Sequence, residues 1–395
     1  MLLLAMGFAG VVLLQRIRAR RSVYIRCALD RISQRLQTSV SKFGYRAIVS
    51  TSGTEMVDFE WTNSKSTKPH LCRQWNRLCG GVKCLEDKRI LGLIMNSIPG
   101  ALQTYSITSW EDLEKIASVA KRLPSRFWVL KDSRANGAAG IWFLDLHDDG
   151  KSLNRAKDIV CNAQQKSDIS FCLQEYCPQP LMLYEGRKFH LRITAVVCAS
   201  GMGFVHRLGF LHPANKPFVV EDLLDNQVQL TNLCINMHQG GREICMDVKL
   251  QFPNLWPKIL DLWANTVETT FQVGMRHQRV GGDFEYVGLD IMANEAGEVF
   301  LLEINSPPAL YSATGQLEAD EQHQKMLNDL FEYIVCPGLV GNGTTTEFGG
   351  FEQIRFSPTA VQRWDTWHSA QSKCDLLLMR FLLQQRKRQD LLWIG

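Results

Sequence analysis

The sequence lacks the cysteine pattern of a structural zinc module. Its 395 residues include twelve cysteines, but no Cys-x-x-Cys pair occurs, and the only loose cluster is Cys72, Cys79 and Cys84. Scattered cysteines in a chain of this size are typical of buried free thiols in a reducing compartment, not of zinc ligands or a disulfide framework. We therefore expect neither a zinc site nor secretion.

The sequence also has little net charge and no internal repeat. The formal net charge is +4, which is too small to predict nucleic-acid binding but does not oppose an acidic peptide partner. Because the chain has 395 residues and is 45% apolar, it can bury a sizeable core, which suits a folded protein with several subdomains.

The N-terminus carries no charge over residues 1–15 and then continues with Arg16, Arg18, Arg20 and Arg21. This apolar stretch is short for a membrane span, and a signal peptide places its positive charges ahead of the apolar run. Three interpretations stay open. They are an organelle-targeting presequence, a weak membrane anchor with a basic flank, and an incorrectly predicted start codon.

Two apolar-patterned strands flank the turn-forming residues 293–297 and predict a β-hairpin. If the hairpin is symmetric about Ala296 and Gly297, Asp290 lies directly opposite Glu303, with Cβ atoms about 5 Å apart. The sequence therefore predicts two carboxylates facing each other across neighbouring strands.

The second strand of this hairpin carries Glu303 and Asn305 at alternate positions. Strand alternation puts them on one face about 7 Å apart, together with Leu301, while Leu302 points to the other face. With Asp290, these side chains offer the hard oxygen ligands that Mg²⁺ shares with substrate phosphates and water. The alternative is the solvated outer face of an edge hairpin.

A further strand pattern, residues 187–197, gathers cations on one face. Lys188, His190 and Arg192 share this face, and apolar residues alternate with them. Such a face suits a polyphosphate, because lysine acts as a point charge and the arginine fork binds phosphate or carboxylate through two hydrogen bonds. An exposed amphipathic strand is the alternative.

A loop of small residues follows the predicted strand 127–130. Lys131 stands at its start, Gly140 stands at its end, and the apolar run 141–144 comes next. Backbone N–H groups of such a loop approach phosphates closely, and the lysine adds charge. The loop lacks the Gly-Lys-Ser/Thr ending of a P-loop and no helix follows it, so neither a P-loop nor a dinucleotide fingerprint is predicted.

The order of these segments resembles the tubulin-tyrosine ligase-like proteins, a family of amino-acid ligases built on the ATP-grasp fold. The resemblance covers roughly residues 45–333. Weaker matches in the N-terminal part include Asp58-Phe59-Glu60-Trp61 and Lys88. Five segments carry the resemblance: Trp128-Val129-Leu130-Lys131 with Gly140-Ile141; Leu173-Gln174-Glu175-Tyr176 with Pro180-Leu181; Gly186-Arg187-Lys188-Phe189-His190-Leu191-Arg192; Leu230-Thr231-Asn232 with Asn236; and Phe284-Glu285 through Asn305-Ser306-Pro307.

The resemblance implies an α+β protein in which two α/β subdomains clamp Mg-ATP. We expect an apolar and then basic extension at residues 1–44, the ATP-grasp domain with its small N-terminal subdomain at 45–335, and a loop with a helical tail at 336–395. The tail has an irregular amphipathic pattern, and Arg386-Lys387-Arg388 within it either contacts an acidic partner or stays in water.

The resemblance also assigns site residues. It places ATP among Lys131, Gly140, Gln174, Glu175, Tyr176, Lys188, His190, Thr231 and Asn232. It places Mg²⁺ on Asp290, Glu303 and Asn305. It gives catalytic roles to Lys188, Arg192 and Glu303, with Arg192 stabilising the reacting phosphate or the acceptor carboxylate.

The implied reaction joins an amino acid to a protein carboxylate. ATP phosphorylates the carboxylate to an acyl phosphate, and the amine of tyrosine, glutamate or glycine displaces the phosphate. Magnesium and fixed cations stabilise the developing negative charge. The implied partners are a free amino acid and tubulin or another protein with an acidic tail, with no nucleic acid, and the implied location is the cytoplasm at the cytoskeleton.

Four positions depart from the family pattern. His190 stands in place of an aspartate, Gln229 in place of a histidine, Ala138 in place of a glycine, and His212 in place of an arginine for which Arg207 is the nearest substitute. Each change lies near the nucleotide or the acceptor. Two alternatives therefore stay open: a degenerate member that binds nucleotide or tubulin without ligation, and an ATP-grasp ligase that acts on a small-molecule carboxylate.

Overall fold

The computed structural model describes residues 22–27, 29–50, 56–62, 72–78, 86–133, 135, 138–165, 170–183, 185–198, 202–219, 222, 225–236, 241–272, 283–337 and 348–356. The presequence or anchor expected within residues 1–21 and the tail expected from residue 359 onward lie outside these ranges, as do Cys79 and Cys84. Within the described ranges, no helix is both long enough and apolar enough to cross a membrane.

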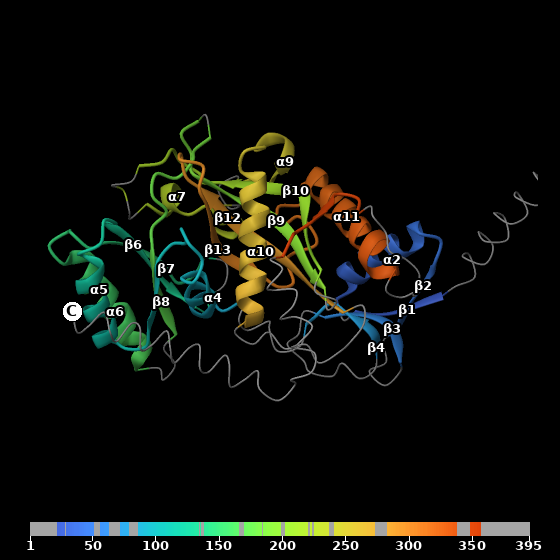
Figure 1. The fold of residues 1–395 in the computed structure, drawn as a ribbon, viewed down its shortest axis with the longest axis horizontal. Helices are drawn as coiled ribbons and strands as arrows, with labels where there is room; N and C mark the ends of the chain where they lie inside the picture. The colour runs from blue at the N-terminus through green and yellow to red at the C-terminus, as the bar shows by residue number, and fades with distance from the viewer. Residues whose placement is uncertain are drawn as a thin grey trace, which may run out of the picture.

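A six-stranded antiparallel sheet forms the centre of the molecule (Figure 1). Its strands follow the order β11-β10-β9-β12-β13, and β14 pairs with the first part of β10. The bounds are β9 Phe189–Cys198, β10 Gly203–Pro213, β11 Ile244–Asp247, β12 Phe284–Ala293, β13 Val299–Asn305 and β14 Phe351–Gln353. The predicted hairpin is confirmed as β12 and β13.

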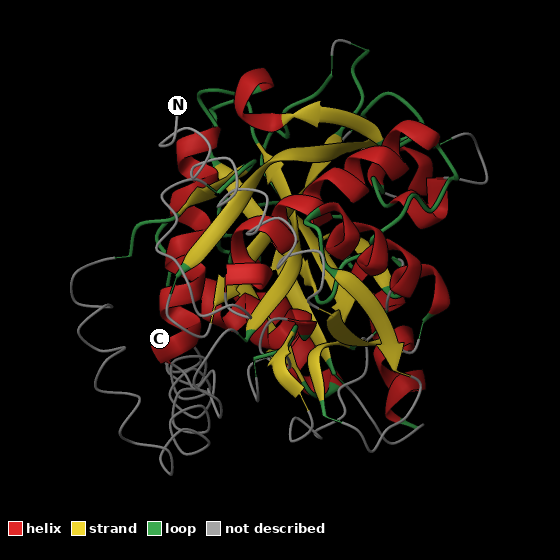
Figure 2. Ribbon diagram, turned by 90° about the vertical axis from the view of Figure 1, so that its right-hand side faces the viewer, coloured by secondary structure: helices red, strands yellow, loops and turns green. Residues whose placement is uncertain are grey.

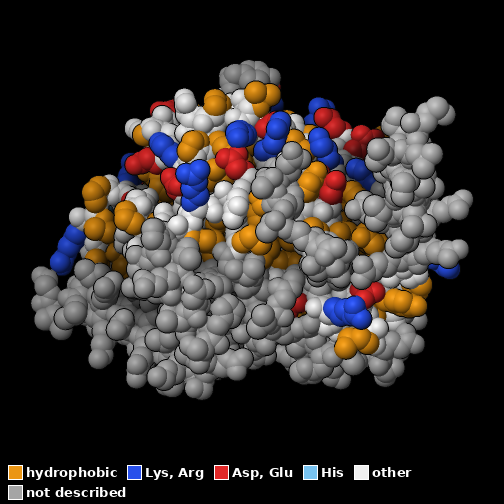
Figure 3. Space-filling model, turned by 45° about the vertical axis from the view of Figure 1, so that its right-hand side comes forward, with side chains coloured by type: hydrophobic (Ala, Val, Ile, Leu, Met, Phe, Trp, Pro, Cys, Tyr) orange, Lys and Arg blue, Asp and Glu red, His pale blue; other side chains and the backbone are white. Residues whose placement is uncertain are grey.

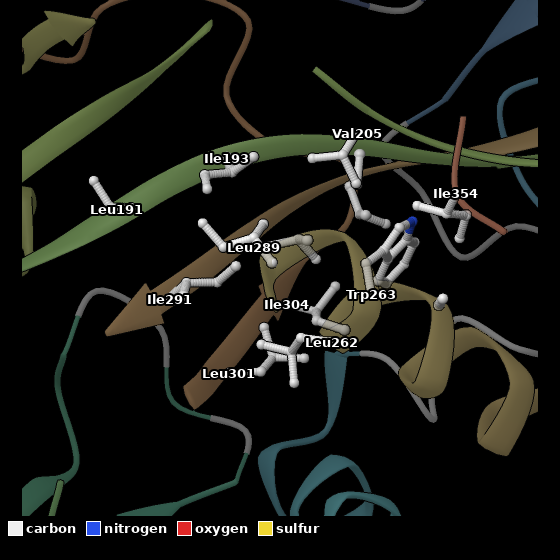
Figure 4. Packing of buried hydrophobic residues seen from close by; sticks show 14 of the residues in the cluster. Leu191, Ile193, Val205, Leu262, Trp263, Leu289, Ile291, Leu301, Ile304 and Ile354 are labelled. Atoms are coloured by element: carbon white, nitrogen blue, oxygen red, sulfur yellow. The ribbon is translucent and has the colours of Figure 1, made fainter. Parts of the chain in front are cut away.

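One face of the central sheet packs on the long helix α10, Trp256–Gln272. Leu191 and Ile193 of β9 point into this core, where Figure 4 shows them on the same side of the sheet as Trp263 of the helix. Ile193 and Trp263 are fully buried, and burial of such side chains contributes about 2–3 kcal/mol each to stability relative to exposure. The apolar half of the predicted alternation in this strand is confirmed.

The opposite face of β9 changes character along its length. Lys188, just before the strand, and His190 and Arg192 at its start give this face its polar end, whereas Val196 and Cys198 lie near the other end. The apolar end packs against the N-terminal layer of the molecule, so only the polar end is left to line a site. The sequence pattern of this one strand thus fixes where the site lies along the sheet.

A second antiparallel sheet has the order β5-β8-β6-β7. Its strands are β5 Thr104–Ile107, β6 Phe127–Asp132, β7 Ile141–Asp145 and β8 Phe171–Glu175. Helices α5, Trp110–Ala120, and α6, Lys151–Gln164, cover one face, where Trp128 and Leu130 of β6 join their core. The alternating residues Val129 and Lys131 therefore face the other way, toward the central sheet. This arrangement confirms the predicted strand, loop and strand around Lys131.

A parallel four-stranded sheet with the order β2-β1-β3-β4 forms the N-terminal layer (Figure 1). It comprises β1 Ser22–Cys27, β2 Arg46–Ser50, β3 Val57–Trp61 and β4 Cys72–Trp75, with α2, Asp30–Lys42, crossing between β1 and β2. The boundary expected between residues 44 and 45 falls inside this layer, because β1 and α2 share its core. Likewise β14 belongs to the central sheet although it lies beyond residue 335.

The remaining described helices are short or lie at the edges of the sheets. Figure 2 shows helices on both sides of the central strands, which agrees with the predicted α+β class. The helix α11 packs against α2, and α4 packs between β5 and α10. The bounds are α4 Lys88–Met95, α7 Asn226–Gln229, α8 Leu233–Asn236, α9 Val248–Gln251, α11 Leu317–Leu330 and the π-helical turn Phe331–Val335.

Candidate functional site

A pocket opens between the central sheet and the second sheet. It collects the polar ends of β9 and β12, the end of β13, the pocket-facing side of β6 and β8, and the segment around α7. The predicted residues that line it are Lys131, Gln174, Glu175, Tyr176, Lys188, His190, Thr231, Asn232, Asp290 and Glu303. Apolar walls come from Leu102, Val129, Ile141, Phe143, Met292 and Leu302.

Lys131 enters the pocket from β6. Its Nζ donates to Oε1 of Gln174 at 2.6 Å and lies 3.5 Å from the carbonyl oxygen of Leu302. Gln174 is itself held, because its amide donates to Oγ1 of Thr104 at 3.1 Å. Burial lowers the pKa of Lys131, as expected for an ammonium group whose described hydrogen-bond acceptors are neutral.

Lys188 enters the same pocket from the central sheet, beside β9. Its Nζ donates to the hydroxyl of Tyr176 at 2.9 Å and lies 3.4 Å from Oε1 of Gln229. The rings of Phe143, Tyr176 and Phe218 surround it at 4.8 to 5.7 Å from their centroids. Burial lowers the pKa of Lys188 to about 7, so its charge state responds strongly to an anion in the pocket.

The carboxylates of the hairpin lie at the edge of this pocket. Asp290 pairs with Glu303 across β12 and β13, so the predicted opposition of these two residues is confirmed. Arg192 binds both oxygens of Asp290, and Nδ2 of Asn305 lies 3.5 Å from Oδ2. Burial opposes ionisation of Asp290, but the neighbouring Arg192 charge outweighs it and lowers the pKa of the carboxyl.

A β-bulge corrects one part of the hairpin prediction. The pairing register shifts between Asp290 and the next residue of β12, which leaves Leu302 as the extra residue of β13. Leu301 consequently packs with Ile304 in the core against α10, while Leu302 lines the pocket beside Glu303. The prediction that Leu301 shares a face with Glu303 was wrong, because a bulge breaks the two-residue alternation of a strand.

The small-residue loop depends on a left-handed glycine. Gly140 adopts φ +82°, and a Cβ atom there would lie 2.8 Å from Cβ of Asp132. Only glycine takes this conformation at low cost, and its carbonyl accepts from the backbone of Asp132 at 2.8 Å. Ala138, which replaces a glycine of the family pattern, has φ +60°, a conformation that costs a non-glycine residue about 1 kcal/mol.

Lys88 is a cation of the site that the sequence indicated only as a weak N-terminal match. It is the first residue of α4, whose N-cap Asp87 accepts from the backbone N–H groups of Arg89 and Ile90. Its Nζ donates to the carbonyl of Ala135 in the small-residue loop at 2.7 Å and lies 3.5 Å from Oε2 of Glu303. It therefore connects this loop to the acidic hairpin.

Two of the unusual histidines touch each other. His190 and His212 are partners across β9 and β10, and Nε2 of His190 lies 3.2 Å from Nδ1 of His212. Burial lowers the pKa of His190 to about 3 and also lowers that of His212, so both rings are neutral at physiological pH. The expected substitute cation, Arg207, pairs with Asp247 at 2.7 Å on the exposed side of β10, and it does not replace the missing arginine.

The pocket fits a polyphosphate. In the described part of the chain, the hydrogen-bond acceptors of Lys131 and Lys188 are amide, carbonyl and phenol oxygens. A buried ammonium without an anion is costly, so a phosphate group placed here would stabilise both lysines. Asp290, Glu303 and Asn305 have the oxygen donors that Mg²⁺ prefers, but Arg192 competes for Asp290.

A family model described as the Tubulin-tyrosine ligase family matches residues 97–342. The chain is 24% identical over 286 residues to tubulin glycylase 3B of Tetrahymena thermophila, covering 64% of this chain and 23% of that protein. It is 27% identical over 262 residues to a probable tubulin–tyrosine ligase of Schizosaccharomyces pombe, covering 58% of this chain and 62% of that protein. The chain thus spans less than two thirds of either relative.

Among solved structures, the C-terminal domain of Pby1 from K. lactis, described as an ATP-grasp enzyme interacting with the mRNA decapping enzyme Dcp2, is similar to this chain. The TM-score is 0.58 at 18% identity, covering 85% of this chain and 99% of that domain. The ATP-grasp fold that the sequence predicts is therefore confirmed. Since the family match extends over more than half of the residues and includes the whole pocket, this chain belongs to the tubulin-tyrosine ligase family.

Proposed function

We propose that this protein is an ATP-dependent ligase that joins an amino acid to a protein carboxylate. One observation carries the proposal: Lys131 and Lys188 reach one pocket from two different sheets, with Asp290 and Glu303 at its edge. Two buried cations suit the phosphates of ATP. Two carboxylates beside them suit the divalent ion that accompanies ATP.

Each residue has a role in this reaction. Lys131 and Lys188 bind the phosphates, while Gln174, Glu175 and Tyr176 frame the base. Mg²⁺ on Asp290, Glu303 and Asn305 would neutralise charge on the phosphates.

Arg192 has a separate role, which is to stabilise the reacting carboxylate. Its fork, released from Asp290, stabilises the carboxylate as it becomes an acyl phosphate. Displacement of phosphate by the amine of the incoming amino acid then forms the amide bond.

The acceptor that we propose is a tubulin tail, because the matched relatives are named as tubulin-modifying enzymes. With this acceptor, the proposed location is the cytoplasm at microtubules. On the face shown in Figure 3, basic and acidic side chains of the described residues are interspersed. The proposal of an acidic acceptor therefore rests on the relatives and not on a basic patch of this face.

A second candidate function is that of a family member that binds nucleotide or tubulin without catalysing ligation. Three described features favour it: Arg192 already binds both oxygens of Asp290, the pair of His190 and His212 carries no charge, and Arg207 points away from the pocket. Each of these features reduces the positive charge that is free to stabilise a reacting carboxylate.

Intact-mass spectrometry of tubulin tails distinguishes these functions. The protein is incubated with tails, Mg-ATP and a mixture of tyrosine, glutamate and glycine, and ATP binding is measured on the same sample by calorimetry. A discrete mass gain supports the ligase and identifies the added residue. ATP binding without a mass gain supports the second candidate, unless turnover appears with small carboxylic acids, which would replace both tubulin proposals.

A further inference from the structure

A chain of polar contacts runs beneath the wall of the pocket. Oγ1 of Thr231, which lines the pocket, lies 2.7 Å from Nδ1 of His190. Nε2 of His190 lies 3.2 Å from Nδ1 of His212, and Nε2 of His212 lies 3.8 Å from Oε1 of Glu243. All four residues are less than a tenth exposed, so the protons of this chain are arranged by the protein and not by bulk water.

The buried carboxylate of Glu243 sets the direction of hydrogen-bond donation at one end of this series of contacts. Its Oε2 accepts from Ser312 at 2.6 Å, and Nε2 of His323 lies 3.9 Å from Oε1. Burial opposes ionisation of Glu243, but the neighbouring His212 and His323 rings and the hydrogen bond from Ser312 outweigh it and lower the pKa of the carboxyl. Because a bare nitrogen lone pair facing a carboxylate oxygen is repelled, this contact favours a proton on Nε2 of His212, which leaves Nδ1 as an acceptor.

The contact between the two rings passes the same direction on to His190. Its Nε2 faces the accepting Nδ1 of His212 at 3.2 Å, and this contact requires a proton on Nε2 of His190. The ring is neutral, so its Nδ1 is bare and can only accept a hydrogen bond, which the hydroxyl of Thr231 must donate.

We propose that Glu243, acting through the two histidines, holds the Thr231 hydroxyl as a hydrogen-bond acceptor toward the pocket. The hydroxyl proton points to His190, so the oxygen presents only lone pairs to a ligand. The site therefore selects a ligand with an O–H or N–H group at this position, such as a sugar hydroxyl or the exocyclic amine of a purine. Glu243 and His212 are positioning residues, and the ligand class rests on the proposed nucleotide function.

Histidine ¹⁵N chemical shifts test the proton arrangement directly. In protein labelled with ¹⁵N-histidine and assigned with single His-to-Gln variants, long-range ¹H–¹⁵N spectra distinguish the two neutral tautomers of each ring. We expect the Nε2–H tautomer for both His190 and His212 at neutral pH. An Nδ1–H tautomer at His190 would overturn the proposal, and this measurement requires no bound nucleotide.

Nucleotide analogues test the consequence for the ligand. Thr231→Val removes the acceptor, and we expect ATP affinity to fall about fivefold, whereas Thr231→Ser, which keeps the hydroxyl, should recover most of the affinity that Thr231→Val loses. The same comparison is made with 2′-deoxy-ATP, 3′-deoxy-ATP and purine riboside triphosphate, which lacks the amine. The analogue without the recognised donor should bind the wild type and Thr231→Val equally, and so identifies that donor.

The outcomes of this comparison separate the two proposals. Equal ATP affinity of wild type and Thr231→Val overturns the inference while leaving the nucleotide site intact. If the wild type binds no nucleotide, the proposed function fails, and the histidine tautomers alone decide whether Thr231 is an acceptor.

Discussion

Arg192 binds both carboxylate oxygens of Asp290: its Nη2 lies 2.9 Å from Oδ2, and its Nε donates to Oδ1. The side chains are 20% and 7% exposed, so this is a largely buried pair with two hydrogen bonds. Such a pair strongly penalises the removal of one partner, because the other charge is left buried. It also means that a metal ion and Arg192 compete for the same carboxylate.

The first prediction concerns the free energy of unfolding. Asp290→Asn removes the charge that Arg192 requires, and we expect a loss of about 3 kcal/mol. Glu303→Gln changes a partly exposed carboxylate whose cationic contact with Lys88 is 3.5 Å long, and we expect a loss of less than about 1 kcal/mol. Urea unfolding of the two isosteric variants measures the difference. Equal stabilities would mean that the pair of Asp290 and Arg192 is not maintained in solution.

The second prediction concerns magnesium. Glu303→Gln keeps the shape of the hairpin but removes one of its two carboxylates, and a divalent ion prefers charged oxygen ligands. We expect magnesium-dependent turnover to be abolished while the circular dichroism spectrum and the urea midpoint stay close to those of the wild type. Retained turnover at the same magnesium concentration would place the metal on other residues.

The features that depend on one strand were predictable from the sequence. The shared face of Lys188, His190 and Arg192 follows from strand alternation, a local property that a two-residue period defines. The hairpin itself follows from its turn residues, but the observed pairing of Asp290 with Glu303 also depends on the bulge, because the register that starts with Ala293 opposite Val299 shifts just before Asp290. The polar face of β9 was sufficient to locate the pocket along the central sheet.

The features that depend on distant segments were not predictable in the same way. The β-bulge that moves Leu302 into the pocket has no signal in the strand pattern. Contact between His190 and His212 requires the register of β10, which shifts between Val205 and Gly209. Glu243 reaches the histidines from a loop before β11, and nothing in its own neighbourhood indicates this role.

The third prediction concerns the pH dependence of nucleotide binding. In the free protein burial lowers the pKa of Lys188 to about 7, and a bound polyphosphate raises it again by favouring the charged form. Affinity is therefore fully present below the lower pKa and falls as pH rises through it. We expect the affinity for ATP to weaken roughly tenfold from about pH 6.5 to about pH 8.

Variants of two lysines test this assignment. Lys188→Met should weaken binding and remove most of the pH dependence over the same range, whereas Lys151→Met, a change at an exposed lysine at the start of α6, should leave the wild-type profile. Calorimetric titrations in buffers of low ionisation enthalpy also report the uptake of a proton on binding. A flat wild-type profile would show that Lys188 is charged before the nucleotide arrives.

The fourth prediction concerns the two histidines that replace charged residues of the family pattern. His190→Asp alone introduces a carboxylate beside Asp290, which already lies 3.7 Å from the ring. His212→Arg alone introduces a cation that has Glu243 on one side, 3.8 Å from the replaced ring, but only the neutral His190 ring on the other. Because the two residues are in contact across β9 and β10, the new charges satisfy each other only in the double variant. We expect each single variant to lose activity and stability, and the double variant to regain both.

A double-mutant cycle on unfolding free energy and on turnover measures this coupling. We expect a favourable interaction of about 2 kcal/mol in stability, and turnover of the double variant at or above that of the wild type if weak ligation is the native activity. Additive effects would mean that the two positions act independently despite their contact. A stable double variant that binds ATP but transfers no amino acid to any acceptor would instead favour the non-ligating member, because the charge at both positions would then be restored without restoring the reaction.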